Sequence, residues 1–151
     1  MDVTMPEQQL REAVDRITQE VTRSAAGIEL RHCAACPGAS RYSVYIGFQK
    51  GFHFGFSLRA DAVMLTRLSQ AILCVQSVSP QDLEDVAKEY INVLCGHFAH
   101  AFYRATQVAS RFDVPAFYRG TFHPQGQAER FSINYAAGTG GLVQLVYHVP
   151  E

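Results

Sequence analysis

The sequence predicts an α+β fold with a mostly antiparallel or mixed sheet and three main helices, one of them long. Apolar residues recur at helical spacing near the N-terminus and again between about 60 and 107, and they alternate with polar residues between 42 and 58. Strand-like segments follow the second helical stretch. The expected order is helix, strands, two helices, strands, which favours helices packed on a sheet within one domain over residues 1–151.

The composition limits the classes of function. The 151 residues are 48% hydrophobic, enough for one core, and 13 Lys and Arg nearly balance 14 Asp and Glu. No run of five like charges occurs, so we expect no nucleic-acid or membrane partner. No apolar run approaches the roughly 18 residues of a membrane span, and the N-terminus does not resemble a secretion signal. The four cysteines are then reduced thiols, and a cytoplasmic protein is expected.

The first helix has clear end signals. Residues Thr4 to Glu7 have the form of a capping box, in which Glu7 reaches back to the Thr4 amide. Gly27 is expected to end the helix. The apolar stripe between these ends consists of Leu10, Val14, Ile17 and Val21.

A hairpin is expected next. Residues 42–48 and 52–58 both alternate, with aromatic and aliphatic residues at the even positions, and Lys50-Gly51 between them predicts a two-residue turn. One strongly aromatic face is then buried. A preceding strand is expected within residues 28–34.

Two helices and three strands complete the chain. A helix is expected from about Ala60 to Val75, and Ser79 then provides an N-cap with Pro80 at the first helical position and Asp82 at the third. The long helix continues to about Gln107. Strands are expected at 112–118, 130–135 and 142–149, the last two joined by the glycine-rich turn AAGTGG.

The long helix carries a narrow polar stripe opposite its buried face. At helical periodicity the stripe contains Asp85, Glu89, Asn92, Gly96, His100 and Tyr103. Glu89 and Asn92 are neighbours on the helix surface and are placed to contact one object together. Asn92 and Gly96 are poor helix formers, so their position needs a reason other than helix stability. By itself the stripe is also compatible with an ordinary solvated helix face.

This stripe resembles the signature of the CheX/CheC-type chemotaxis phosphatases. That signature has an Asp or Ser, three residues, Glu, two residues, Asn, and a proline some twenty residues later. Here it reads Asp85-VAK-Glu89-YI-Asn92, followed by Gly96 and by Pro115 in DVPAFYRG. The layout over about residues 28–149 is similar to that family too. The single copy of the motif is similar to CheX, whereas CheC-type chains usually carry two related halves.

The resemblance implies a CheC-like fold and a hydrolase that removes phosphate from the phosphoaspartate of a CheY-like response-regulator receiver domain. Glu89 would pair with the receiver's lysine, and Asn92 would hold the attacking water. The partner-binding surface would contain Asp85, Lys88, Gly96, His100 and Pro115. The Mg²⁺ ion would belong to the receiver, with no cofactor bound by this chain. The resemblance also suggests a homodimer built through sheet edges. The alternative is a non-catalytic receiver-binding or flagellar-switch-like module, because FliM-type proteins share the fold without this motif.

Two other motifs contain metal-ligand residue types. Cys33 and Cys36 form a CxxC, which is compatible with redox exchange or half of a metal site, but no second CxxC completes a zinc site. We favour ordinary thiols there. His97 and His100 form an HxxH, but they are about 60° apart around the helix, His97 lies off the polar stripe, and no acid shares their turn. No metal site is therefore expected.

Overall fold

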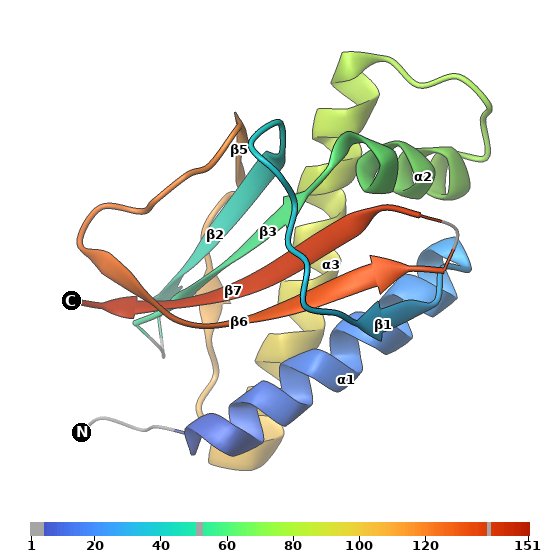
Figure 1. Cartoon of the computed structure of the whole chain (residues 1–151). Coiled ribbons are helices and arrows are strands. Elements are labelled where there is room, and N and C mark those ends of the chain that lie inside the picture. Colours follow the sequence, from blue (N-terminus) through green and yellow to red (C-terminus); the bar gives the residue numbers. More distant parts are fainter. Residues whose placement is uncertain (1–4, 51–52, 139) are drawn as a thin grey trace.

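The computed structural model describes residues 5–50, 53–138 and 140–151, which form three helices and seven strands (Figure 1). The helices are α1 (Glu7–Ala26), α2 (Ala62–Leu73) and α3 (Pro80–Thr106). The strands are β1 (Leu30–His32), β2 (Tyr42–Lys50), β3 (Gly55–Ala60), β4 (Arg111–Phe112), β5 (Ala116–Arg119), β6 (Gln127–Ala137) and β7 (Leu142–Pro150). The predicted α+β class and the order of the elements are confirmed.

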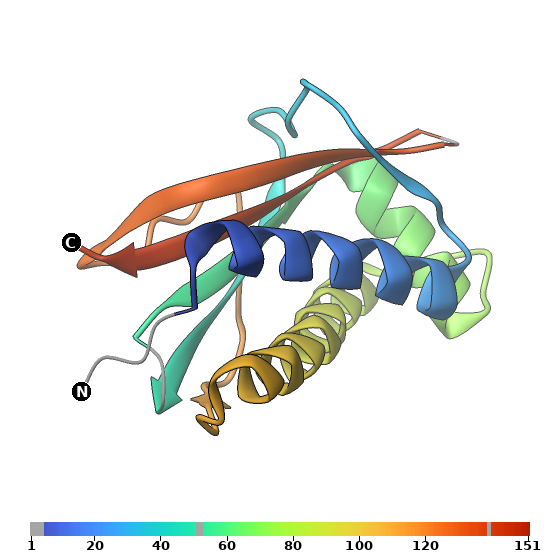
Figure 2. The ribbon, with the colours of Figure 1, turned by 90° about the horizontal axis from the view of Figure 1, so that it is seen from below.

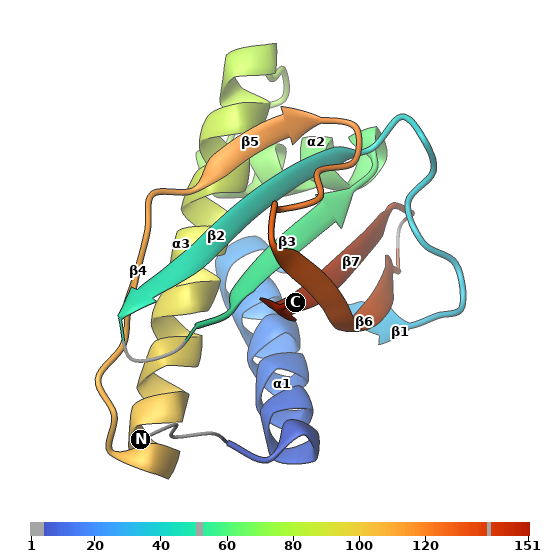
Figure 3. The ribbon, with the colours of Figure 1, turned by 90° about the vertical axis from the view of Figure 1, so that its left-hand side faces the viewer.

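The sheet is antiparallel at every described pairing. Its strand order is β1-β6-β7-β3-β2-β4, and β5 also pairs with β2, so that β4 and β5 lie along the same strand (Figure 3). Figures 1 and 2 show all three helices on one face of this sheet, while the segment 33–41 passes over the opposite face. The apolar core lies between the helices and the sheet. No described helix combines the length and the apolar composition that crossing a membrane requires.

Helix α1 begins later than the capping pattern predicts. The expected N-cap, Thr4, lies outside the described residues, and the helix starts at Glu7 after Pro6, which makes no side-chain cap. The Glu7 carboxylate instead accepts a hydrogen bond from Arg130 Nε at 3.2 Å. The predicted end is confirmed, because Gly27 has a left-handed φ of 66° and its N–H donates to the carbonyl of Arg23.

The β2–β3 hairpin is confirmed, but its register differs from the one that a two-residue turn at Lys50-Gly51 gives. A turn at Lys50-Gly51 would place Phe48 opposite His53, whereas the Phe48 N–H donates to the Phe54 carbonyl at 2.9 Å. Lys50 belongs to β2, and residues 51–52 lie outside the described part of the chain. The observed register pairs Ile46 with Phe56, so even positions of both strands share one face. A slip of one residue would turn one strand's apolar side chains away from the core.

The remaining strands differ in length from their predictions. The single strand expected at 112–118 is divided into β4 and β5 by Asp113–Pro115, where Val114 is 80% exposed. Pro115 has no N–H for a ladder bond, which favours a break at that point. Strands β6 and β7 are longer than the predicted segments and are joined by the expected turn, of which Thr139 lies outside the described residues.

Candidate functional site

Helix α3, which carries the motif, has well-defined ends. Ser79 Oγ accepts from the Asp82 N–H at 3.1 Å, and the Asp82 carboxylate accepts from the Ser79 N–H at 2.9 Å. Pro80 is the first helical residue, as predicted, and Gln107 ends the helix with a left-handed φ of 62°. Because both ends are capped, the 27 residues form one continuous helix that holds its side chains in fixed relative directions.

One side of α3 is buried through most of the helix. Its buried residues are Val86, Ala87, Tyr90, Ile91, Leu94, Cys95, Phe98 and Phe102. They belong to the core formed with the sheet and with α1, and the ring of Phe98 lies 4.9 Å from that of Phe56. Burying this many large apolar side chains fixes which side of the helix remains outside.

The opposite side carries the predicted polar stripe. Asp85, Glu89, Gly96 and His100 are exposed, and Asn92 is half-buried. Figure 2 shows no described element covering α3 on the side away from the sheet. The structure therefore leaves this side of α3 accessible to a partner.

The polar groups of Glu89 and Asn92 are not bonded to other described residues. Neither side chain there has a hydrogen-bond, ion-pair or ring partner, and neither polar atom of the Asn92 amide is sealed from solvent. A free carboxylate and a free amide on adjacent turns of one helix can bind a cation and orient a water or hydroxyl group. The sequence placed the two groups together, and the structure shows that both are available.

Gly96 is not required by packing inside the protein. A Cβ added there would meet no atom within 4 Å. Glycine in a helix interior costs about 1 kcal/mol relative to alanine, so it lowers helix stability without an internal benefit. Its effect is to leave the helix backbone open on the same side as Asn92.

Asp85 and Lys88 already have partners on the helix. Gln81 Nε2 donates to Asp85 Oδ1 at 2.9 Å, and Lys88 Nζ lies 2.9 Å from Glu84 Oε2. Exposed pairs of this kind contribute only a few tenths of a kcal/mol, so a partner can displace them at small cost. These two residues are suited to the rim of a contact and not to its centre.

The two other predicted partner-binding residues, His100 and Pro115, lie in different parts of the structure. His100 is exposed one turn beyond Gly96. Pro115 is half-buried and immediately precedes β5, which packs against α3.

Two exposed apolar side chains on α3 are absent from the predicted partner-binding residues. They are Val93, which is 37% exposed, and Tyr103, which is 44% exposed. A helical wheel places Tyr103 on the stripe, and large exposed side chains are a common feature of protein contact surfaces.

The cysteines and histidines form no metal site in the described residues. Cys33 is half-buried, Cys36 and Cys74 are exposed, Cys95 is buried, and all four are free thiols. Within that part of the chain, no three His, Cys, Asp or Glu side chains converge to hold a metal ion. Burial raises the pKa of the Cys95 thiol, which keeps it protonated and unreactive.

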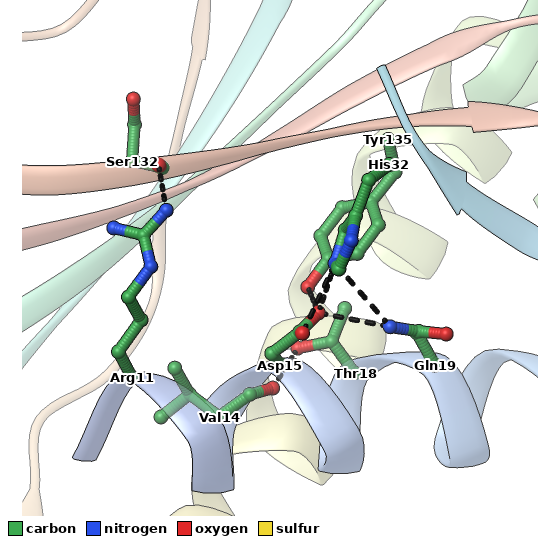
Figure 4. Close-up of polar contacts among 8 residues, drawn as sticks. All are labelled: Arg11, Val14, Asp15, Thr18, Gln19, His32, Ser132 and Tyr135. Atoms are coloured by element: carbon green, nitrogen blue, oxygen red, sulfur yellow. Dashed lines mark hydrogen bonds and ion pairs between the residues drawn. The ribbon is translucent and has the colours of Figure 1, made fainter. Parts of the chain in front are cut away.

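A polar cluster that the sequence did not predict joins α1 to β1 and β6 (Figure 4). Asp15 Oδ1 accepts hydrogen bonds from Tyr135 Oη at 2.6 Å and from Gln19 Nε2 at 2.9 Å, and His32 Nε2 lies 2.8 Å away. Burial raises the pKa of Asp15, but the bonds from Tyr135, His32 and Gln19 outweigh it and leave the pKa below its usual value. The cluster fastens the short strand β1 to α1.

A second unpredicted cluster lies on the sheet face away from the helices. Ser57 Oγ and His148 Nε2 are 2.8 Å apart, and the buried guanidinium of Arg59 contacts Glu129 Oε1 at 2.6 Å. Burial lowers the pKa of His148 to about 4. All residues of β3 are buried, so the polar positions of the hairpin are also covered, in part by Phe122, whose ring lies 5.5 Å from that of Tyr45.

Similarity to known proteins is found among solved structures. No protein-family model matches the sequence, and no curated protein matches it. A CheX from Desulfovibrio desulfuricans superposes with a TM-score of 0.72 at 15% identity, over 92% of this chain and 97% of that one. A chain of the CheX–CheY–BeF3–Mg²⁺ complex from Borrelia burgdorferi gives 0.73 at 13% identity, over 94% and 98%.

A third solved structure comes from a different assembly. A chain of the FliM–SpeE complex from H. pylori superposes with a TM-score of 0.65 at 9% identity, over 95% of this chain and 90% of that one. At such low identities the agreement concerns the arrangement of helices and strands. The CheC-like fold that the sequence resemblance implies is thus confirmed: this chain has the fold of the CheX and CheC-like proteins.

Proposed function

We propose that this protein binds a CheY-like receiver domain and hydrolyses its phosphoaspartate through Glu89 and Asn92. The observation that carries the proposal is the pair itself, two side chains without partners among the described residues, on the uncovered side of a capped helix. The similarity in fold to a CheX captured with CheY and BeF3 supports the choice of partner.

The two side chains have different roles in this proposal. The Glu89 carboxylate pairs with the receiver's lysine and holds α3 against the phosphorylation site. The Asn92 amide donates one hydrogen bond and accepts another, so it holds a water in line with the acyl phosphate without having to ionise. Orienting a water removes part of the entropic barrier of a reaction that is otherwise bimolecular.

The metal that such a reaction needs would be supplied by the receiver. A divalent cation neutralises charge on the phosphoryl oxygens in phosphoryl transfer. In the described residues of this chain no side chains converge to hold one, and Glu89 is used for docking in this proposal. In this proposal this chain docks on the receiver and orients the attacking water, and the receiver provides the phosphorylated aspartate and its metal ion.

The test is loss of phosphate from a purified receiver domain that has been phosphorylated by a small-molecule donor in the presence of Mg²⁺. The wild-type protein should accelerate this loss, and Asn92→Ala should return the rate to that of the receiver alone. Gln125→Ala, at an exposed position outside α3, is the control and should retain the wild-type rate. Equal rates for the wild type and Asn92→Ala would reject a catalytic role for the amide.

A second function, receiver binding without turnover, is favoured by one finding. The fold is also that of a chain in the FliM–SpeE complex, so the fold alone does not imply hydrolysis. Binding to a receiver activated with beryllofluoride, together with an unchanged lifetime of the phosphorylated receiver, would select this alternative.

A further inference from the structure

We propose that Tyr90 is a positioning residue, whose hydroxyl group sets the rotation and axial position of α3 and so the direction in which Glu89 and Asn92 point. Its catalytic consequence rests on the proposed function. The structural part, a hydrogen bond that holds the motif helix against α1, can be tested without any substrate.

Tyr90 follows Glu89 in the chain but lies on the buried side of the helix. It is 4% exposed, and its hydroxyl is hydrogen-bonded to Thr22 Oγ1 of α1, a residue that is 0% exposed. The direction of this bond can be assigned. Thr22 Oγ1 donates its own proton to the Thr18 carbonyl at 2.6 Å, so the Tyr90 hydroxyl is the donor to Thr22. Burial raises the pKa of Tyr90 to about 12, which keeps this donor protonated.

The Tyr90–Thr22 bond has no equivalent elsewhere on α3 in the described residues. The other side-chain hydrogen bonds and ion pairs of α3 there join residues of the helix to one another or to its flanking residues, Ser79 and Val108. Its other contacts with α1 and the sheet are made mainly by apolar side chains of the core. Apolar packing tolerates small shifts between elements, whereas a hydrogen bond between two buried groups is satisfied at one relative position.

A small rotation of α3 would matter at the site. Side chains extend about 5–6 Å from a helix axis, so a rotation of roughly 10° moves their ends by about 1 Å. Misplacement of a catalytic group by about 1 Å can cost as much as 100-fold in rate. Glu89 and Asn92 are on the same helix as Tyr90, so both move with any such rotation.

The experiment compares Tyr90→Phe with Tyr45→Phe. Each variant deletes one tyrosine hydroxyl that is hydrogen-bonded inside the protein and keeps the ring. Tyr45 is the control, because its hydroxyl donates to Gln127 Oε1 at 2.7 Å, on the sheet face away from α3. Tyr135 is unsuitable, because its hydroxyl, which donates to Asp15 (Figure 4), also interacts electrostatically with Tyr90. In Tyr90→Phe, Thr22 keeps its bond to the Thr18 carbonyl, so no buried hydroxyl loses its last partner and the fold is expected to be retained.

Two readouts are expected to separate the variants. Relative to the amides of β6 and β7, which report any loss of global stability, hydrogen exchange of the α3 amides should be about tenfold faster in Tyr90→Phe, since a buried hydrogen bond is worth about one factor of ten. In Tyr45→Phe any increase should be the same in α3 and in these strands. In the receiver assay, Tyr90→Phe should lower kcat about fivefold or more and change KM less than twofold. Tyr45→Phe should lower Tm but keep the wild-type kcat.

A double variant isolates the bond. Thr22→Val added to Tyr90→Phe should not lower kcat further, because the bond is already absent. Wild-type exchange in the α3 of Tyr90→Phe, or faster exchange with an unchanged kcat, would overturn the positioning role. If the wild-type protein hydrolyses no receiver phosphate, the proposed function and the catalytic part of this inference fail together. The exchange data then still decide whether Tyr90 holds the helix.

Discussion

Glu89 and Tyr90 are consecutive residues of α3 that belong to opposite environments. Glu89 is exposed and has no side-chain partner in the described residues, whereas Tyr90 is buried and its hydroxyl is bonded to Thr22 of α1. The residues that hold the helix and those proposed to act on a partner are therefore interleaved along one short segment. Substitutions within it should separate stability from function.

Replacing Glu89 should weaken docking. A charge-assisted hydrogen bond to a lysine contributes about 1.5–3 kcal/mol, so Glu89→Ala should raise the Kd for a beryllofluoride-activated receiver about tenfold or more. Calorimetric titration would measure this, with Glu20→Ala on α1 as an exposed carboxylate control. Raising the salt concentration should weaken the wild-type complex more than the variant. An unchanged Kd for Glu89→Ala would remove the carboxylate from the contact.

Filling Gly96 should stabilise the protein and impair its function. Gly96→Ala should raise the free energy of unfolding by about 0.5–1 kcal/mol, because the new Cβ meets no atom within 4 Å. Gly96→Leu should fold equally well and bind the receiver at least about tenfold more weakly, because its side chain occupies the space the partner needs. Urea unfolding would measure the stability of Gly96→Ala, and titration with the receiver would measure binding by Gly96→Leu. Wild-type binding by Gly96→Leu would show that no partner approaches there.

The buried His148 should make stability depend on pH. Burial lowers its pKa in the folded state to about 4 from the usual 6.5, with Glu129, Arg59 and His123 as the facing charged groups. Between pH 6.5 and 4 the unfolded chain binds a proton that the folded protein does not, so stability falls as the pH is lowered. The full loss is about 3 kcal/mol.

Urea unfolding between pH 7 and pH 4 would measure this dependence. His148→Gln removes the titrating group and should flatten it over this range. His53→Gln, at an exposed histidine, should retain the wild-type slope. An identical slope in wild type and His148→Gln would mean that the pKa of this imidazole is the same in the folded and unfolded states.

Asp15 should stabilise the contact of α1 with β1 and β6. Asp15→Asn replaces an acceptor of several hydrogen bonds by an amide, so it should cost about 1–3 kcal/mol at pH 7. Because its folded pKa is depressed, the wild-type advantage is present above pH 3.8 and lost as the pH falls through the folded pKa. Denaturation at pH 7 and at pH 3 would measure this: the free energies of unfolding of the wild type and Asp15→Asn should differ at pH 7 and become more similar at pH 3. Glu12→Gln, at an exposed carboxylate of the same helix, should change little at either pH.

Much of the fold could be predicted because its signals are local. The end of α1 at Gly27 and the start of α3 at Ser79 depend on residues within one turn, and both were predicted. The two alternating runs of the hairpin predicted one buried face. Its register was missed although the pattern contains it. Directly paired residues of antiparallel strands point to the same face, so apolar even-numbered residues on both strands require even positions to pair, whereas a turn at Lys50-Gly51 pairs even positions with odd ones.

The candidate site also has features that the sequence determines and features that depend on the tertiary structure. The sequence by itself determined that Asp85, Glu89, Asn92 and Gly96 share one side of a helix, because helical geometry relates residues three and four apart. Only the tertiary structure decided that this side remains uncovered, that Tyr90 is tied to Thr22, and that Ser57 is buried with His148. Those facts depend on contacts between segments far apart in the chain, and a pattern of period two or 3.6 carries no information on which segments meet.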